Sequence, residues 1–293
     1  MSDYKKQEIL PNLERQPFEP RALKSIVLST ITVICAVIAI IPLFSVLIML
    51  LYRGGKRLKL EVFYSLPPTA FDLGGGFGNA ILGTLFMVGV GALISVPFGV
   101  LAAIFLAELG PYSKVARVAR FCAKTMTGLP SILAGVFAYA AVVLVMGTYS
   151  AWAGGIALSL LMIPVVMLTT EEAIKMVPEP MKEAAFGMGC TQAQSMTKVI
   201  LPVALPSIIT GVVLAVARAA GETAPLLFTA LFSDYWLRAN EPTASLAVLI
   251  YNYSGMPFEN QIELAWAASL VLVLLVFILN MISRAIGRRT RIK

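Results

Sequence analysis

The sequence predicts an all-α integral membrane protein with about six transmembrane helices. Hydrophobic residues make up 58% of its 293 residues and charged residues only 13%, and the mean hydropathy is +0.85. Soluble domains carry about 25% charged residues, so this composition indicates a membrane protein. Several stretches of the chain also run without charge for about 20 residues, which is the length that one helix needs to cross a bilayer.

These uncharged stretches place the spans in order along the chain. The longest, 125–170, has room for two helices, and the glycine-rich segment 147–155 marks a break between them. The six predicted spans, all most simply helices, are 26–51, one helix within 74–107, two helices within 125–170, 207–231 and 264–283. The membrane domain thus covers 25–283, with a polar segment 1–24 before it and a basic tail 284–293 after it.

The distribution of lysine and arginine predicts the orientation. With six spans both termini lie on one side, and that side receives seventeen of the 23 basic residues, whereas the other side receives five and Arg218 lies within a span. By the positive-inside rule both termini are cytoplasmic. One outer loop departs locally from this rule, because it follows the first span directly and carries Arg53, Lys56, Arg57 and Lys59.

The composition argues against several kinds of chemistry. The chain has no histidine, and Cys35, Cys122 and Cys190 are far apart without metal-ligand spacing, so disulfide, zinc and triad sites are not expected. No Gly-x-x-x-x-Gly-Lys-Ser/Thr segment occurs, and the glycine run at 74–79 indicates only a flexible entry to the second span, with Asn79 as a helix N-cap. We therefore expect no catalytic residue, no metal and no cofactor bound by the chain itself.

Three smaller features have structural interpretations. Gly91, Ser95 and Gly99 form a stripe of small residues in the second span, which predicts a face for close helix packing. Glu108 lies at the cytoplasmic end of that span, where it is most simply solvated, and the alternatives are contact with an ATPase or a pair with Lys114. Between the last two spans, the apolar segment 244–254 predicts a short helix at the surface or across the outer mouth.

The segment RAAGETAPLLFTA, residues 218–230, places Arg218 and Glu222 inside the fifth predicted span. A helix that begins near 207 puts Arg218 about 16 Å deep, close to the centre of the bilayer. A charge at that depth costs at least roughly 2.5 to 3.5 kcal/mol, so it should face protein or water. On a helical wheel both charges share an arc of about 60° with Gly211 and Ala215, and Thr229 continues this stripe.

Two interpretations of this pair remain open. In one, Arg218 and Glu222 form an i, i+4 ion pair that holds the helix against a neighbour. In the other, Arg218 attracts an anion that crosses the membrane, and Glu222 weakens the attraction so that the anion is released. Pro225 should weaken the helix just beyond the pair.

The predicted cytoplasmic loop 171–206 has a helix, break, helix pattern. Pro178 and Pro180 end one helix, a short helix follows and is broken at Gly187 and Gly189, and a further helix runs up to Pro202. An alanine face beside a glycine break offers a compact knob that another protein could enclose. The alternative is an amphipathic connector on the membrane surface.

This loop resembles the EAA loop of ABC importer permeases. The match consists of Glu183, Ala184, Ala185, Gly189, Leu201 and Pro202, and it departs from the usual pattern only at Val199, where isoleucine is commonest. The resemblance implies the type I ABC importer permease fold. It also implies that these six residues form a coupling helix that docks in a cleft of a cytoplasmic ATPase, so ATP is used by the partner and not by this chain.

The segment ARAAGETAPLLFTA, residues 217–230, further resembles permease subunits of the bacterial phosphate ABC importer, as do NAILGTL, GVLAAIFLAE and GLPSILAGVFAY elsewhere. This resemblance implies an inner-membrane subunit that transports inorganic phosphate, with Arg218, Glu222 and Thr229 along the pathway. The implied partners are a second permease similar to PstC, a dimer of ATPase subunits similar to PstB and an extracytoplasmic phosphate-binding protein similar to PstS. The rivals are an ABC importer for another oxyanion or solute and, in a different class, a stand-alone channel or secondary transporter.

Overall fold

A computed structural model describes residues 20–290 except residues 70 and 73, and all regular structure in this part is helical. The chain divides into two compact units, residues 1–49 and 50–293. The α-helices are α1 (Pro20–Arg57), α2 (Gly78–Ile104), α3 (Lys114–Thr127), α4 (Ser131–Ala138), α5 (Leu144–Met146), α6 (Ala151–Lys175), α7 (Glu179–Gly187), α8 (Gln192–Ser195), α9 (Leu201–Ala220), α10 (Ala224–Thr229), α11 (Leu246–Ser254) and α12 (Glu259–Thr290). Four shorter turns accompany them, a 3₁₀ turn η1 (Leu60–Phe63) and the π-helical turns η2 (Phe105–Leu109), η3 (Tyr139–Val143) and η4 (Met196–Ile200).

The first unit consists of the N-terminal part of α1. Its side chains from Leu23 to Met49 are mostly apolar and are exposed on every face. The segment Leu23–Arg57 is long and apolar enough to cross a membrane. A helix that is apolar all round is typical of a membrane span. Most of the predicted N-terminal segment, residues 1–19, lies outside the described residues.

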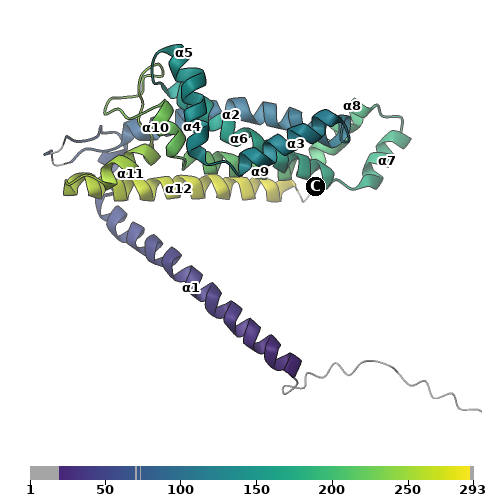
Figure 1. The fold of residues 1–293 in the computed structure, drawn as a ribbon, viewed down its shortest axis with the longest axis horizontal. Coiled ribbons are helices and arrows are strands. Elements are labelled where there is room, and N and C mark those ends of the chain that lie inside the picture. The colour runs from purple at the N-terminus through teal and green to yellow at the C-terminus, as the bar shows by residue number, and fades with distance from the viewer. Residues whose placement is uncertain (1–19, 70, 73, 291–293) are drawn as a thin grey trace, which may run out of the picture. The chain divides into compact units, whose positions relative to one another are not determined.

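The second unit is a bundle of four long helices, α2, α6, α9 and α12, which run side by side (Figure 1). α11 lies at one end of this bundle, and α7 and α8 lie at the other. Apolar clusters fill both ends. The cluster at the α11 end includes Val62, Phe77, Leu246, Leu249 and Leu264, and the cluster near α7 includes Ile174, Val177, Ile200 and Ile208.

The predicted small-residue face of the second span is confirmed. A Cβ added at Gly91 would lie 3.2 Å from the carbonyl oxygen of Gly155, and one at Gly99 would lie 2.8 Å from Cγ1 of Val166. Ser95, between them, is fully buried. These positions allow α2 and α6 to pack closely along their length, as small residues do between membrane helices.

The prediction of about six spans is confirmed, with changes in the third. Five helices are long and apolar enough to cross a membrane, and the sixth candidate is a pair, Lys114–Thr127 and Ser131–Met146, bent by 109°. A single straight helix from 125 to the glycine break at 147 is therefore wrong. The bend coincides with Gly128 and Pro130, and a proline disfavours helical backbone at the residue before it.

The fifth predicted span also has different limits. Its helix begins at Gln192 and ends at Ala220, so an unbroken helix over 207–231 is wrong. The start was misplaced because the helix that was expected to end at Pro202 continues into the span, so the polar segment 192–200 belongs to the same helix. The weakening expected near Pro225 is confirmed, because the helix stops at Gly221 and resumes as α10, with Pro225 in its first turn.

At the α11 end of the bundle one expectation is wrong and another is confirmed in part. Asn79 is not an N-cap: its amide donates hydrogen bonds to the carbonyls of Ser233 and Tyr235, at 2.8 and 3.2 Å. The segment 244–254 does form a helix, α11, capped by Ser245. Its residues Leu246 to Leu249 are buried in the core, however, so it is not a surface helix.

Candidate functional site

One continuous helical rod joins the two regions that the sequence singles out. α8, η4 and α9 follow each other without interruption from Gln192 to Ala220. At 1.5 Å per residue this rod is about 43 Å long, and Arg218 lies about 40 Å from its start. The EAA-like segment is at one end of the rod and the charged pair is at the other.

Arg218 and Glu222 lie where the rod ends. The Nε atom of Arg218 is 3.6 Å from Oε1 of Glu222, which is close enough for an ion pair but too long for a good hydrogen bond. The Arg218 side chain is 60% exposed and that of Glu222 is 18% exposed. Within the described residues the Arg218 guanidinium donates no hydrogen bond, and most of its side chain is exposed.

The other residues of the predicted stripe are placed differently. Gly211 packs against Thr169 of α6, and Ala215 is buried, whereas Arg218 is exposed. The small residues therefore pack against other helices of this chain, whereas Arg218 does not face the same neighbouring helix. Thr229 is fully buried, and its hydroxyl donates a hydrogen bond of 2.8 Å to the carbonyl of Pro225.

A close helix crossing fixes the chain just beyond the break at 221–223, in which Glu222 lies. A Cβ added at Gly135 of α4 would lie 2.7 Å from Cα of Pro225, so α4 and α10 touch through backbone. The Thr229 carbonyl also accepts a hydrogen bond from the backbone N–H of Ser150, the N-cap residue of α6. α10, which follows the charged pair, is therefore held in place by α4 at its start and by the N-terminus of α6 at its end.

The EAA-like segment has the predicted helix, break, helix conformation. α7 holds Glu183, Ala184 and Ala185, and it ends at Gly187. Gly189 has a φ of +82°, and its N–H donates to the carbonyl of Phe186 at 2.9 Å. This left-handed conformation at a helix end favours glycine. A Cβ added there would meet no atom within 4 Å, so backbone conformation and not crowding within this chain requires the glycine.

The expected end of the following helix at Pro202 is wrong. The π-helical turn η4 precedes Leu201 directly, and α9 continues through Pro202. Proline has no N–H to donate to the preceding turn, and a widened turn removes the clash of its ring with a carbonyl. The motif residues Leu201 and Pro202 therefore mark a local irregularity inside the rod.

The exposed face of α7 is partly apolar. Glu183, Ala184 and Gly189 are exposed, whereas Ala185 faces inward and is 1% exposed. Around them three large apolar side chains project into the surroundings, namely Met181, Phe186 and Met188, the last of them 78% exposed. Flexible methionines beside a small-residue surface are suited to contact with another protein.

A charged contact ties α7 to the end of α2. The Nζ atom of Lys182 lies 2.6 Å from Oε1 of Glu108, and Gln192 donates to the Glu108 carbonyl at 3.2 Å. Glu108 thus pairs with Lys182 and not with Lys114 as expected. Burial lowers the pKa of Lys182, but hydrogen bonds to Glu108 and Glu179 outweigh it and raise the pKa above the ordinary lysine value. The stabilising contribution of Lys182 is therefore fully present below that ordinary value and is lost only at more alkaline pH.

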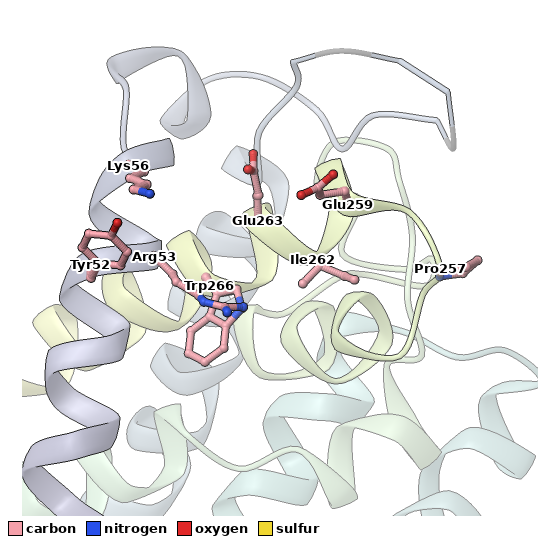
Figure 2. Close-up of a pocket in the computed structure, with 8 residues that line it drawn as sticks. All are labelled: Tyr52, Arg53, Lys56, Pro257, Glu259, Ile262, Glu263 and Trp266. Atoms are coloured by element: carbon pink, nitrogen blue, oxygen red, sulfur yellow. The ribbon is translucent and has the colours of Figure 1, made fainter.

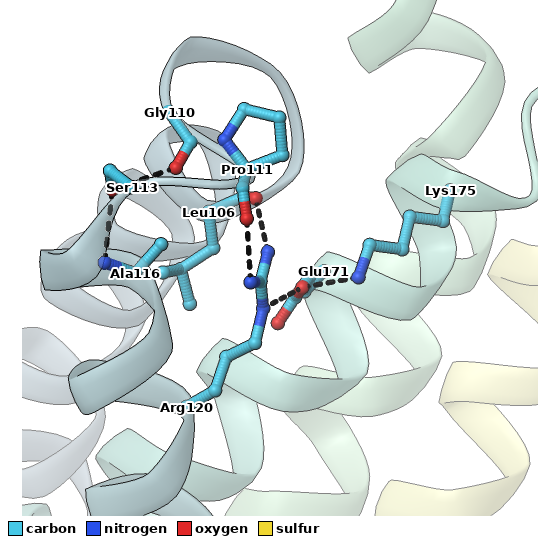
Figure 3. A network of polar contacts seen from close by, with 8 residues as sticks. All are labelled: Leu106, Gly110, Pro111, Ser113, Ala116, Arg120, Glu171 and Lys175. Carbon is cyan, nitrogen blue, oxygen red and sulfur yellow. Dashed lines mark hydrogen bonds and ion pairs between the residues drawn. The ribbon is translucent and has the colours of Figure 1, made fainter.

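A second charged cluster joins α3, η2 and α6 (Figure 3). Arg120 donates to the buried carboxylate of Glu171 at 2.6 Å, to the Pro111 carbonyl at 2.8 Å and to the Leu106 carbonyl at 2.6 Å. Lys175 pairs with the same carboxylate. Sequence reasoning missed this cluster, since it treated Arg120 only as a sign of topology. The charge of Glu171 at the end of an apolar stretch was the available signal.

Comparison with known proteins identifies the family. The model of the family described as "Binding-protein-dependent transport system inner membrane component" matches residues 95–292. Similar proteins include the phosphate transport system permease protein PstA of Haemophilus influenzae, 42% identical over 253 residues, which are 86% of this chain and 89% of that protein. PstA of Yersinia pestis is 40% identical over 235 residues, 80% of each chain, and the probable PstA of Methanocaldococcus jannaschii is 37% identical over 81% of this chain and 84% of that one.

Solved structures share the fold. A bacterial alginate ABC transporter, in complex with an alginate-bound periplasmic protein, covers 94% of this chain and 98% of its own with a TM-score of 0.65 at 16% identity. The inward-facing MetNI methionine ABC transporter covers 73% of this chain and 94% of its own with a TM-score of 0.59 at 22% identity. The expected type I ABC importer permease fold is confirmed.

Proposed function

Since this chain belongs to the family of binding-protein-dependent transport system inner membrane components, we propose that it is a permease subunit of an ATP-driven phosphate importer. The observation that carries this proposal is the 42% identity to a phosphate permease over 86% of the chain. The exposed guanidinium of Arg218 at the end of an apolar rod supports it, because a phosphate anion needs such donors in place of water.

In the proposed pathway Arg218 meets the anion and Glu222 limits its affinity. The Arg218 side chain is 60% exposed, so its guanidinium is accessible to an anion from outside this chain. Glu222 stays near enough to lower the net positive charge, so the anion binds but is not trapped. Thr229 was expected in the same pathway, but its buried hydroxyl is already used within α10, so we assign it to packing.

We propose that α7 is the part that docks in the ATPase. Glu183, Ala184 and Gly189 supply the exposed surface, and Ala185 packs the helix onto its own chain. Leu201 and Pro202 directly follow the widened turn inside the rod. The Lys182–Glu108 contact makes α7 move together with α2. ATP is hydrolysed by the partner, and this chain has no catalytic role of its own.

The proposed orientation places both termini and α7 in the cytoplasm. It rests on the basic residues counted along the sequence. Cys122 lies exposed on α3 and would be cytoplasmic, whereas Arg238 lies exposed in the opposite loop. A thiol reagent that cannot cross membranes, added outside intact cells, should modify the Arg238→Cys variant and leave Cys122 unmodified. Reaction at Cys122 would reverse the orientation.

The partners in this proposal are a second permease, a dimer of ATPase subunits and an extracytoplasmic phosphate-binding protein. The direct test is purification of the full chain from its own cells in mild detergent, followed by identification of the bound proteins. An ATPase and a second permease are expected. A homo-oligomer that lacks an ATPase would favour the rival channel or secondary transporter instead.

A further inference from the structure

A charged pocket of about 560 Å³ lies at the α11 end of the bundle, and neither Arg218 nor any residue of α7 lines it (Figure 2). Two segments far apart in the sequence form it, the last turns of α1 and the first turns of α12. The side chains that matter are Tyr52, Arg53 and Lys56 from α1, and Glu259, Glu263 and Trp266 from α12. None of these residues has a part in the transport function proposed above.

The pocket lies at the ends of two membrane spans. The candidate span of α1 ends at Arg57, and that of α12 begins at Glu259. Tyrosine and tryptophan side chains are enriched where helices leave the hydrocarbon and enter the headgroup layer. Tyr52 and Trp266 therefore put this pocket at the depth of lipid headgroups.

The sequence holds the two segments together at close range. A Cβ added at Gly54 would lie 2.7 Å from the Trp266 carbonyl oxygen, so only glycine permits this approach of α1 to α12. One turn later, Arg57 donates to the Asn260 side chain at 2.8 Å and to the Gly74 carbonyl at 2.7 Å. These contacts fix α1 against α12 beside the pocket.

The charges of opposite sign stay separate inside the pocket. The Arg53 guanidinium lies 5.5 Å from the centre of the Trp266 ring, and the Lys56 ammonium lies 4.2 Å from that of Tyr52. Figure 2 shows both cations beside these rings, with Glu259 and Glu263 projecting from α12. Among the described residues none of these four charged groups forms an ion pair with another protein group, although they line a single pocket.

We propose that this pocket binds the headgroup of a zwitterionic phospholipid of the phosphoethanolamine type. The lipid phosphate is held by Arg53 and Lys56, and the lipid ammonium is held by Glu259 and Glu263. A ligand that carries both charges satisfies both pairs of side chains. Free inorganic phosphate offers the same anionic chemistry, but it has no cation for the two carboxylates and is repelled by them.

This assignment accounts for the basic outer loop that departs from the positive-inside rule. Arg53 and Lys56 face the lipid phosphate, and Arg57 is used inside the fold. Of the four basic residues in this loop, only Lys59 then has neither a role in lipid binding nor a side-chain hydrogen bond among the described residues. The proposal depends on the membrane position of α1 and α12 and not on the transported substrate.

The test is native mass spectrometry of the complex that contains the full chain, titrated with phosphatidylethanolamine, with anionic phosphatidylglycerol and, separately, with inorganic phosphate. The unaltered protein should bind phosphatidylethanolamine more tightly than phosphatidylglycerol. The Arg53→Gln, Lys56→Gln double variant should lose at least about tenfold in affinity for phosphatidylethanolamine, because charged hydrogen bonds to phosphate are removed. Lys59→Gln, which removes a neighbouring cation outside the pocket, is the matched control and should bind normally.

A second variant protects the test against simple misfolding. Glu259→Gln with Glu263→Gln keeps the phosphate contacts and should reverse the preference toward phosphatidylglycerol, which is a gain that a damaged fold cannot produce. Glu61→Gln is its control. Unchanged preference in this variant, or full binding by the Arg53→Gln, Lys56→Gln variant, would overturn the proposal. Displacement of the lipid by inorganic phosphate would overturn it too, in favour of a site for free phosphate.

Discussion

Arg218 and Glu222 form a close pair, but their side chains differ in solvent exposure. They are one helical turn apart, and their charged atoms are 3.6 Å apart, yet the arginine is 60% exposed and the glutamate 18%. Exposed ion pairs contribute about 0 to 1 kcal/mol, so this contact alone gives little reason to keep two charges in an apolar stretch. The exposure of Arg218 favours the interpretation in which it acts on something outside this chain.

The first prediction concerns Glu222. In Glu222→Gln the positive charge of Arg218 is no longer offset, so phosphate should bind more tightly and leave more slowly. With a pair energy of about 0.5 to 1 kcal/mol, the KM for phosphate uptake should fall about two- to fivefold, with a lower maximal rate. Uptake of labelled phosphate by proteoliposomes that contain the assembled complex measures both quantities.

Glu241→Gln is the matched control, since Glu241 forms an exposed pair with Arg238 at 3.3 Å in a loop away from the pathway. Its KM should stay at the unaltered value. An unchanged KM in Glu222→Gln would contradict the role given to this carboxylate.

At the scale of elements, α7 depends on backbone conformation at one residue. Gly189 has a φ of +82°, whereas Gly187 does not have a positive φ, and a Cβ added at either would meet no atom within 4 Å. Gly189→Ala should therefore cost about 1 to 2 kcal/mol of backbone strain and weaken ATPase binding about five- to thirtyfold. Gly187→Ala should bind normally. Pull-down of the ATPase subunit compares the two, and equal binding would show that the left-handed turn is not needed for docking.

The cluster around Arg120 is expected to stabilise the α7 end of the bundle. Arg120→Met removes three hydrogen bonds and leaves the buried Glu171 carboxylate with Lys175 as its remaining partner. Loss of a partner from a buried pair costs on the order of 3 kcal/mol, so the variant should unfold at a clearly lower temperature in detergent. Arg117→Met removes an exposed arginine from the same helix and should change little. Equal unfolding temperatures would contradict this account.

Sequence patterns predicted the features of individual helices correctly where the residues that determine them are close together in the sequence. The stripe of Gly91, Ser95 and Gly99 correctly predicted a packing face, and Gly189 correctly marked the break after α7. Contacts between distant segments could not be predicted, because nothing in the sequence pairs Glu108 with Lys182 or Arg120 with Glu171. Asn79 was misassigned for the same reason, since its partners are 154 and 156 residues away.

For the whole molecule, hydropathy predicted the class of fold and the number of spans but not their limits. Charge-free windows cannot distinguish a straight span from the pair bent by 109° at Pro130. They also hide the polar first turns of the rod that begins at Gln192, which is why Arg218 was expected near the middle of one long helix. The structure instead places Arg218 at the end of a helical rod that begins next to α7.

This arrangement connects the two proposed functional regions of the second unit through one continuous helix. α7 is held to α2 by Lys182, and the rod extends from α8 to the charged pair. We infer that movement of α7 changes the surroundings of Arg218, so ATP hydrolysis by a partner alters access of the anion to its site. The central claim is that Arg218 acts on the transported phosphate and does not merely brace its helix.

The measurement that tests this claim most directly is ATP-driven uptake of labelled phosphate by proteoliposomes that contain the assembled complex with Arg218→Gln. Removal of a charged hydrogen-bond donor to the anion should lower uptake at least about tenfold, while assembly and the basal rate of ATP hydrolysis are retained. Arg218→Lys keeps the charge and should retain part of the uptake. Full uptake by the assembled Arg218→Gln complex would contradict the claim and leave Arg218 as a brace beside the pathway.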